Sequence, residues 1–225
     1  RGAGTTSLVP HVYVSNTGNG TVSAIDPVTD TVRSTITVES WPGNLAALPG
    51  GGKLYVPNRD SNSVSVISTD SNIVLKTIYD ARFNSPYAVA PTPFGDEVWV
   101  VNESGFGGWA VSIISTSDDT VIGAIPYESG GCVQGPEGIA ANPKNHEMYV
   151  SSRDNEALCV FDRTTRSLTR SILIGGAVEH GVVLPDGTAV YVNDGPAGAV
   201  SRIAMPSGVV TRIANADGHN MDVSA

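Results

Sequence analysis

YVSN, from Tyr13 to Asn16, is the first copy of a short run that recurs along the whole chain. Each copy is an aromatic residue and a valine followed by a polar turn, and the later copies are YVPN from Tyr55, WVVN from Trp99, YVSS from Tyr149 and YVND from Tyr191. Consecutive aromatic residues lie 42 to 50 residues apart. A period of that length, built from short β-type runs, is typical of the blades of a β-propeller.

Three further β-type runs accompany each aromatic run. One follows it: VSAID from Val22, VSVIS from Val64, VSIIS from Val111, LCVFD from Leu158 and VSRIA from Val200. The next contains an isoleucine in every repeat: Ile36, Ile78, Ile125, Ile172 and Ile213. A fourth precedes the aromatic run: PGNLAALP from Pro42, PYAVAPTP from Pro86, PEGIAANP from Pro136 and EHGVVLP from Glu179. The sequence therefore predicts four-stranded blades, whose strands we name a to d from the innermost outward, the aromatic run being strand b.

The two ends of the chain complement each other in this pattern. The chain starts at a strand b, Val12 to Asn16, and its last run, GHNMDVS from Gly218 to Ser224, has the pattern of a strand a. Counted circularly, this predicts one all-β domain over residues 1–225, a five-bladed β-propeller closed by pairing of its N- and C-terminal strands. Such pairing leaves no open sheet edge. The alternative is an arc from a larger ring, because seven-bladed rings are common among such repeats.

Composition narrows the classes of partner. The chain has 225 residues, a formal net charge of −9 and only 13 Lys plus Arg, which speaks against nucleic acid and against an anionic membrane surface. No apolar run approaches the roughly 18 residues of a membrane span, so we expect no membrane insertion. NGT at Asn19 and NES at Asn102 resemble glycosylation sites and favour a secreted or otherwise extracytoplasmic location. Two cysteines, Cys132 and Cys159, either pair or stay free.

The aromatic run resembles the Tyr-Val-Thr-Asn run that names the YVTN family of β-propellers, and the resemblance covers nearly all of the chain. It implies the propeller fold. For function it implies a mixed set of surface-layer proteins, periplasmic proteins and a few enzymes. The lactonase and streptogramin-lyase propellers also carry runs similar to PEGIA from Pro136, and the lyases use His and Glu at the channel mouth. Those propellers have seven blades, where this sequence predicts five.

Loop lengths predict which face holds a site. In a propeller, the b-to-c and d-to-a connections emerge on one face and the other turns on the opposite face. The longest b-to-c loop, NESGFGGWA from Asn102, and the longest d-to-a loop, PYESGGCVQG from Pro126, share the first face. Insertions on one side of a repeat protein usually mark its binding side, so we expect the site there.

Equivalent positions at the start of strand a suggest the chemistry. Aligning the runs as P-x-G/A-hydrophobic-A places these residues at x: Gly43, Tyr87, Glu137, His180 and His219. Because inner strands surround one axis, Glu137, His180 and His219 would converge and bind a divalent metal ion. Without metal, His and Glu would share acid–base work, with Tyr87 or the second His as acid. The competing interpretation is a polar channel mouth that only holds water.

Other residues have weaker roles. Glu179 and Asn220, beside the two histidines, would point away by strand alternation and orient an imidazole. Arg59 and Arg153 follow strand b and would clamp an anionic substrate or form surface ion pairs. Phe106 and Trp109 in the long loop would cover the pocket or pack on a neighbouring blade. The recurring asparagines that end strand b have a structural role as turn caps: Asn16, Asn58 and Asn102.

These observations favour a small-molecule enzyme of lyase, isomerase or hydrolase type, with its His/Glu site at the mouth of the central channel. The rival is a recognition module, lectin-like or of the surface-layer kind, which binds a glycan or a protein without transforming it. Several similar pockets between blades would indicate the rival, whereas the unequal residues at x favour one site on the axis.

Overall fold

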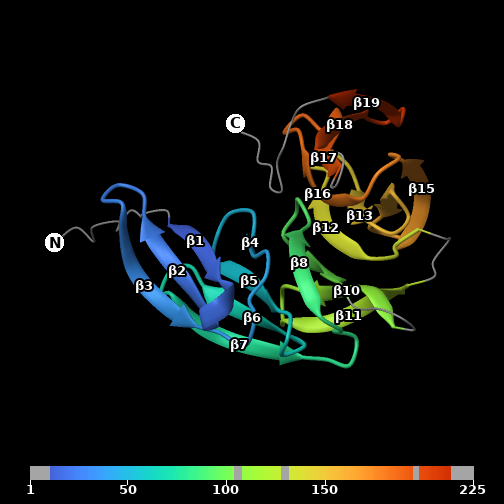
Figure 1. The fold of residues 1–225 in the computed structure, drawn as a ribbon. Coiled ribbons are helices and arrows are strands. Elements are labelled where there is room, and N and C mark those ends of the chain that lie inside the picture. The colour runs from blue at the N-terminus through green and yellow to red at the C-terminus, as the bar shows by residue number, and fades with distance from the viewer. Residues whose placement is uncertain (1–10, 104–107, 128–131, 195–197, 214–225) are drawn as a thin grey trace.

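The computed structural model describes residues 11–103, 108–127, 132–194 and 198–213. Within these ranges the chain folds into β-strands arranged in five antiparallel sheets, one of three strands and four of four strands. The sheets follow one another along an arc, with the three-stranded sheet at one end and the last sheet at the other (Figure 1). The predicted strand Gly218–Ser224 and three candidate site residues lie outside the described residues: Phe106, His219 and Asn220.

The predicted runs form the strands in the predicted order. The first sheet contains β1 (Val12–Asn16), β2 (Thr21–Asp26) and β3 (Thr31–Thr37), with the 3-10 turn η1 (Thr17–Asn19) between β1 and β2. The second contains β4 (Ala46–Ala47), β5 (Lys53–Asn58), β6 (Ser63–Ser68) and β7 (Ile73–Tyr79). The third contains β8 (Pro86–Pro91), β9 (Glu97–Asn102), β10 (Trp109–Ser115) and β11 (Thr120–Pro126). The fourth contains β12 (Pro136–Ala141), β13 (Glu147–Ser152), β14 (Ala157–Asp162) and β15 (Ser167–Leu173).

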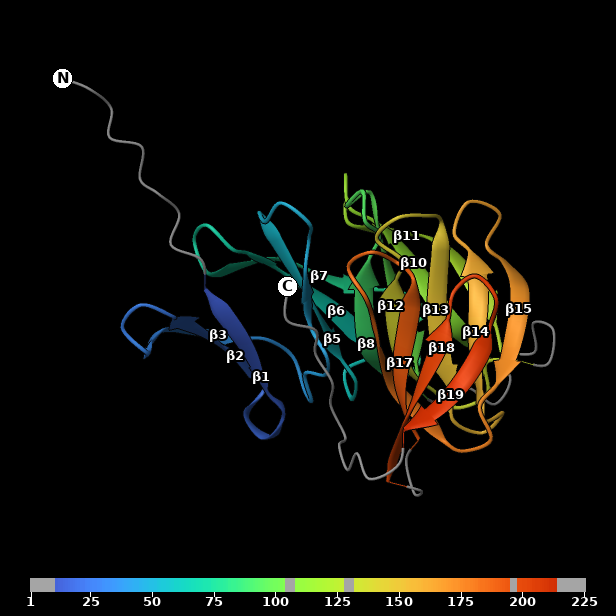
Figure 2. The ribbon, with the colours of Figure 1, turned by 90° about the horizontal axis from the view of Figure 1, so that it is seen from above.

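The fifth sheet contains β16 (Val178–Val183), β17 (Ala189–Asp194), β18 (Ala199–Ala204) and β19 (Val209–Ile213). Seen from above, the sheets stand side by side with their flat faces against one another (Figure 2). The inner strands of neighbouring sheets are in contact, β8 with β12 and β12 with β16. The described residues include no helix with the length and apolar character needed to cross a bilayer.

Strand a of the second sheet is much shorter than predicted, only Ala46–Ala47. Its first residues bond to the next sheet: the amide of Asn44 donates to the carbonyl oxygen of Tyr87, and the amide of Val89 donates to that of Asn44. The approach is so close that a Cβ on Gly43 would lie 2.2 Å from the oxygen of Tyr87. Two inner strands thus join through their backbones, which fixes the position of Tyr87.

The hydrophobic core lies between the sheets. Between the second and third sheets, for example, Tyr55 and Val64 on one sheet and Val100 and Ile114 on the other share a single buried cluster. Alternation along each strand places successive side chains on opposite faces, so each inner sheet contributes apolar residues to two such layers. Burial of these layers is the main favourable term that stacks the sheets.

In the first two sheets, the tyrosine of strand b also anchors its sheet to the next one through its hydroxyl group. The hydroxyl of Tyr13 donates to Oδ1 of Asn72 at 2.7 Å, and that of Tyr55 donates to Oδ1 of Asp119 at 2.5 Å. Asn72 and Asp119 are equivalent, each in the c-to-d turn with a positive φ of 55° and 56°. Burial, followed by the bond to Asp119, strongly raises the pKa of Tyr55. Tyr13 and Tyr55 therefore have a structural role, whereas the hydroxyl of Tyr149 donates to Glu147 of its own strand.

We expect Asp119→Ala to lower the free energy of unfolding by about 2 to 3 kcal/mol, since it leaves the Tyr55 hydroxyl and the Lys53 ammonium without their shared acceptor. Lys53 Nζ lies 2.8 Å from Oδ2 of Asp119, in a pair whose lysine is partly exposed. Urea denaturation measures the change. The matched control is Asp118→Ala, one residue away and exposed, for which we expect a change within about 0.5 kcal/mol. Equal losses in both variants would contradict the anchoring role.

Candidate functional site

The beginnings of strands a and the ends of strands b lie on one face of the molecule. The paired residues there are Pro42 with Asn58, Pro86 with Asn102 and Pro136 with Ser152. The candidate residues follow or flank these pairs, on the face that the loop lengths predict. We call them the inner-strand cluster: Tyr87, Glu137, Glu179 and His180 on strands a, with Arg59, Glu103 and Arg153 just after strands b.

The register between strands a and b corrects one equivalence. The strand a residue that pairs with the aromatic residue of strand b fixes the alignment: Ala90 with Trp99, Ala140 with Tyr149 and Val182 with Tyr191. Three residues before these positions stand Tyr87, Glu137 and Glu179. Glu179, not His180, is therefore the counterpart of Glu137, and His180 matches Gly138. The prediction that His180 shares the register of Glu137 was wrong by one residue.

Hydrogen bonds confirm the corrected register. The amide of Gly138 donates to Oγ of Ser151 at 2.7 Å, and the amide of His180 donates to Oδ1 of Asn193 at 2.6 Å, from the equivalent strand b position. Nδ2 of Asn193 also donates to Oε2 of Glu179 at 3.3 Å. Glu179 thus belongs to the cluster itself, where the sequence had placed it as a group that only orients a histidine.

Three aromatic rings from different sheets form a row across this face. The ring centroids of Trp41 and Tyr87 are 6.5 Å apart, and those of Tyr87 and His180 are 6.3 Å apart. Nε2 of His180 also lies 2.8 Å from Nδ2, the side-chain amide nitrogen of Asn44. An amide nitrogen only donates, so Nε2 of His180 accepts this bond, which joins the second and fifth sheets.

Glu137 is buried, only 8% exposed, beside a cation. Its carboxylate accepts a hydrogen bond from the guanidinium of Arg153, which also contacts Asp154. Burial raises the pKa of Glu137; the charge of Arg153 opposes this, and the nearby carboxylates of Glu179 and Glu103 reinforce it. The net raised pKa favours a carboxyl group that holds a proton more readily than an exposed glutamate.

Arg59 is also paired with a carboxylate. Its Nε lies 2.6 Å from Oε2 of Glu103, and its guanidinium carbon lies 4.6 Å from the centroid of the Trp41 ring. Of the two roles that the sequence left open for Arg59 and Arg153, the structure shows ion pairs. An anionic substrate would therefore have to share each guanidinium with its carboxylate partner.

Tyr87 stands among these charges. Burial raises the pKa of its hydroxyl, the carboxylates of Glu137, Glu103 and Glu179 raise it further, and Arg59 lowers it. A phenol under these conditions keeps its proton and serves as a hydrogen-bond or proton donor. The cluster therefore combines a protonated phenol, a buried carboxyl group with raised pKa and a neighbouring imidazole.

Two residues of this face were missed by sequence reasoning. Trp41 adopts a φ of 60°, an unusual backbone conformation for a bulky residue, and its equivalents Ser85 and Gly135 also have positive φ. The residue before the proline of strand a is Trp41 in one blade and a small residue, Ser85 or Gly135, in two others. This difference was the signal in the sequence that could have identified Trp41. Glu103 occupies the position that Arg59 and Arg153 hold in their own blades, and its opposite charge was the available signal.

The metal-binding prediction concerned Glu137, His180 and His219. The first two are engaged by Arg153 and Asn44, and His219 lies outside the described residues. In the described part of the chain, no group of three or more His, Cys, Asp or Glu side chains is placed to hold a metal ion. Because His219 is outside the described residues, metal binding by these three side chains stays a prediction.

The remaining candidates have modest roles. Trp109 begins β10, is 39% exposed, and its carbonyl oxygen accepts a hydrogen bond from Asn102 at 3.1 Å. The asparagines at the end of strand b have a structural role, but Asn16 and Asn58 bond to side-chain hydroxyls and not, as predicted, to the backbone of the turn. Nδ2 of Asn58 donates to the hydroxyls of Ser63 and Ser65, which links strand b to strand c.

Cys132 and Cys159 form a disulfide, which settles the alternative that the sequence left open. Both cysteines are fully buried. The bond ties the d-to-a connection that leads into β12 to the middle of β14. Gly135 in the same connection donates its amide to the hydroxyl of Tyr127 at 2.9 Å. The segment of residues 132–135, which leads to Glu137, is therefore held by the disulfide at Cys132 and by the hydrogen bond at Gly135.

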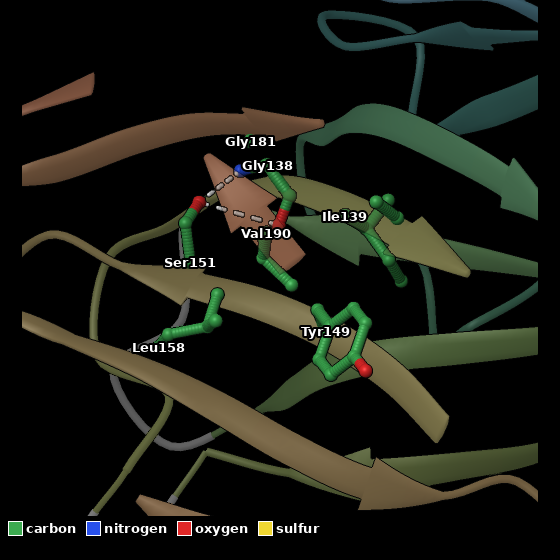
Figure 3. A pocket seen from close by; sticks show the side chains of 8 residues that line it. Gly138, Ile139, Tyr149, Ser151, Leu158, Gly181 and Val190 are labelled. Carbon is green, nitrogen blue, oxygen red and sulfur yellow. Dashed lines mark hydrogen bonds between the residues drawn. The ribbon is translucent and has the colours of Figure 1, made fainter. Parts of the chain in front are cut away.

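A small cavity lies behind the cluster, between the fourth and fifth sheets (Figure 3). Its lining is mostly apolar: Gly138, Ile139, Ala140, Tyr149, Ser151, Leu158, Gly181 and Val190. It has room for about one water molecule, which is too little for a substrate. The cavity is a packing gap beside the close approach of β12 and β16, where a Cβ on Gly138 would lie 2.5 Å from the carbonyl oxygen of Glu179.

Comparisons with known proteins place the fold. No protein-family model matches the chain, and no curated protein sequence matches it. Among solved structures it is similar to hydrazine synthase of Kuenenia stuttgartiensis, with a TM-score of 0.79 at 22% identity over 91% of this chain and 62% of that one. It is also similar to the dihydro-heme d1 dehydrogenase NirN in complex with DHE, with a TM-score of 0.72 at 17% identity over 96% and 45% of the two chains.

A third similar structure is that of the RRP9 WD40 repeats, with a TM-score of 0.65 at 16% identity over 77% of this chain and 51% of that one. These likenesses show that the chain has a propeller-type all-β fold. The chain spans 62% or less of the length of each of these three structures. Two are named as enzymes and one as a WD40 protein, so the fold is compatible with catalysis and with recognition.

Proposed function

We propose that the chain is an enzyme of lyase, isomerase or hydrolase type that acts on a small molecule at the inner-strand cluster by acid–base chemistry. Glu137 takes and returns the proton, Tyr87 donates a hydrogen bond or proton, and His180 fixes the edge of the cluster. The observation that carries the proposal is the convergence of Tyr87, Glu137 and Glu179 from three sheets on one charged, partly buried face.

The charged groups of the inner-strand cluster favour a neutral or cationic substrate. The cluster has three carboxylates, Glu103, Glu137 and Glu179, and two guanidinium groups, each of which already has a carboxylate partner. The chain as a whole carries a formal charge of −9. An anionic substrate would be repelled at long range and would compete with internal carboxylates for both arginines.

A divalent metal remains the other chemistry proposed for these residues. It would require Glu137 and His180 to exchange Arg153 and Asn44 for the ion, so acid–base roles without metal agree better with the contacts present. Metal analysis of the protein purified without chelator tests this alternative directly.

A recognition module is the second candidate, and the aromatic row favours it. The rings of Trp41, Tyr87 and His180 would stack on the faces of a sugar, as aromatic side chains do in polar binding sites. In this case the ion pairs keep the face rigid and no bond of the ligand is broken. The two candidates share the site and differ in whether a product forms.

The deciding experiment compares Glu137→Gln and Tyr87→Phe with the native protein on a panel of neutral and cationic small molecules, with product formation followed by mass spectrometry. We expect turnover to fall roughly 100-fold or more in Glu137→Gln, because the proton-transfer group is lost while its shape is kept. Glu156→Gln, an exposed glutamate outside the cluster, is the matched control and keeps native turnover. Glycan binding without any product, retained in both cluster variants, would contradict the enzyme proposal.

We also propose an extracytoplasmic location and a closed ring of five blades. The disulfide between Cys132 and Cys159 supports the location, because such bonds persist in oxidising compartments. The first sheet has three strands where the others have four, and the segment Gly218–Ser224 would supply its missing strand a. Since the first and last sheets lie at the two ends of the arc (Figure 1), closure needs these ends to be joined.

A further inference from the structure

Negative charges outnumber positive ones at the inner-strand cluster. Five carboxylates lie in it or beside its arginines: Asp60, Glu103, Glu137, Asp154 and Glu179. Among its described residues the cations are the two guanidinium groups of Arg59 and Arg153. His180 adds no charge, because its Nε2 accepts a hydrogen bond and therefore carries no proton. With all five carboxylates ionised, an additional cation would relieve the repulsion between them.

Each arginine engages one oxygen of its carboxylate partner. Nε of Arg59 donates to Oε2 of Glu103 at 2.6 Å, and Nη1 of Arg153 donates to Oε1 of Glu137. Over the part of the chain that the structure describes, the second oxygens of these two carboxylates accept no hydrogen bond. Oε2 of Glu137 is not among the fully buried atoms without a partner, so it reaches the surface although its residue is buried. Two carboxylate oxygens are therefore ready to accept hydrogen bonds from a ligand.

The aromatic row beside these oxygens already holds a cation. The guanidinium carbon of Arg59 lies 4.6 Å from the centroid of the Trp41 ring, and the Tyr87 ring follows Trp41 at 6.5 Å. The electron-rich faces of such rings attract cations and pack on flat apolar groups. The surface thus combines aromatic rings with carboxylate oxygens, and these two features together bind an organic ammonium ion.

We propose that the inner-strand cluster binds a primary amine in its protonated form, carried on a flat or aromatic body. The ammonium group donates to the carboxylate oxygens that the arginines leave unpaired, on Glu103 and Glu137, and the body packs on Trp41 and Tyr87. The inference rests on the proposed function and narrows its substrate to the cationic class. These residues belong to the second, third and fourth sheets and to the connections beside them, so the inference does not depend on how the ends of the arc meet.

A series of ligands with one ring and different head groups tests the amine class. Isothermal titration calorimetry at neutral pH compares benzylammonium, benzyl alcohol and benzoate. We expect benzylammonium to bind roughly tenfold or more tightly than benzyl alcohol, because it adds charge-assisted hydrogen bonds, and benzoate to bind most weakly. Added NaCl should weaken the binding of benzylammonium and not that of benzyl alcohol. Undetectable binding of benzylammonium, or equal affinity for all three ligands, would overturn the proposal.

Benzyltrimethylammonium separates the two parts of the site. It has the same charge and ring but no N–H group, so it contacts the aromatic rings without donating to the carboxylates. We expect it to bind severalfold more weakly than benzylammonium. Equal or tighter binding of this quaternary ion would show that the rings alone hold the cation and would overturn the role of the carboxylate oxygens.

Glu103→Gln tests the carboxylate that contributes most simply. Glutamine keeps the shape and an acceptor for Arg59 but removes the charge, so we expect benzylammonium to bind roughly five- to tenfold more weakly and benzyl alcohol to bind as before. Glu156→Gln, an exposed glutamate outside the cluster, is the matched control with native affinity for both ligands. Thermal unfolding checks that both variants are folded. An equal effect of the two substitutions on benzylammonium would contradict the proposal.

Binding and turnover distinguish this inference from the proposed function. Selective binding of benzylammonium, with no product formed from any compound tested, would support the amine site and contradict the enzyme. Turnover of a neutral compound that falls in Glu137→Gln, together with equal affinity for benzylammonium and benzyl alcohol, would support the enzyme and overturn the amine class.

Discussion

Gly138→Ala is expected to lower the free energy of unfolding by about 3 kcal/mol and to disturb the candidate site, because a side chain at this position meets backbone. A Cβ on Gly138 would lie 2.5 Å from the carbonyl oxygen of Glu179 and 3.0 Å from Cα of His180. Neither atom is the end of a flexible side chain, so the fifth sheet has to shift. The same shift would stretch the bond from Ser151 Oγ to the carbonyl oxygen of Glu179, now 2.5 Å.

Thermal unfolding measures this change, with an expected fall in Tm of roughly 6 to 12 °C, since 1 kcal/mol corresponds to about 2 to 4 °C at this chain length. Gly18→Ala is the matched control, because nothing lies within 4 Å of a Cβ at that position. Gly43→Ala tests the second close approach, where a Cβ would lie 2.2 Å from the oxygen of Tyr87. If Gly138→Ala unfolded at the same temperature as Gly18→Ala, the close packing of the inner strands would be refuted.

The repeat pattern was sufficient to predict the strands because each strand b, c and d must bury one face against a neighbouring sheet. That requirement keeps an apolar residue at every second position, as in Val64, Val66 and their counterparts, and the pattern is visible in a single sequence. Strand a of the second sheet escaped prediction for the opposite reason. Asn44 bonds through its backbone to Tyr87 and Val89 of the next sheet, and backbone contacts leave little trace in residue types.

The candidate site was predicted in part. The face and three members, Tyr87, Glu137 and His180, were identified from unequal residues at an otherwise repeated position. The alignment of EHG with PEG, however, shifted His180 by one residue, because both short runs fit the same pattern and only strand pairing distinguishes them. Burial of Glu137 beside Arg153 depends on contacts between strands that spacing alone does not specify.

The disulfide has a second large expected effect. Replacing both cysteines, Cys132→Ala with Cys159→Ala, is expected to lower the free energy of unfolding by about 3 to 4 kcal/mol, because the bond closes a loop whose ends are 27 residues apart in sequence. Removal of two buried sulfur atoms from the core between the third and fourth sheets adds to the loss. Urea denaturation of native and double-variant protein, each with and without reductant, measures the difference.

The location of this bond gives the experiment a functional readout as well. Cys132 lies in the connection that leads through Gly135 to Glu137, so release of this connection should loosen Glu137 and its ion pair with Arg153. We expect the double variant to lose binding or turnover at the inner-strand cluster at temperatures where the sheets remain folded. In the native protein both sulfurs are buried, hence reductant should act only once the chain opens. Native protein that is fully reduced in urea and then unfolds at its original midpoint would show that the bond contributes neither stability nor order to this site.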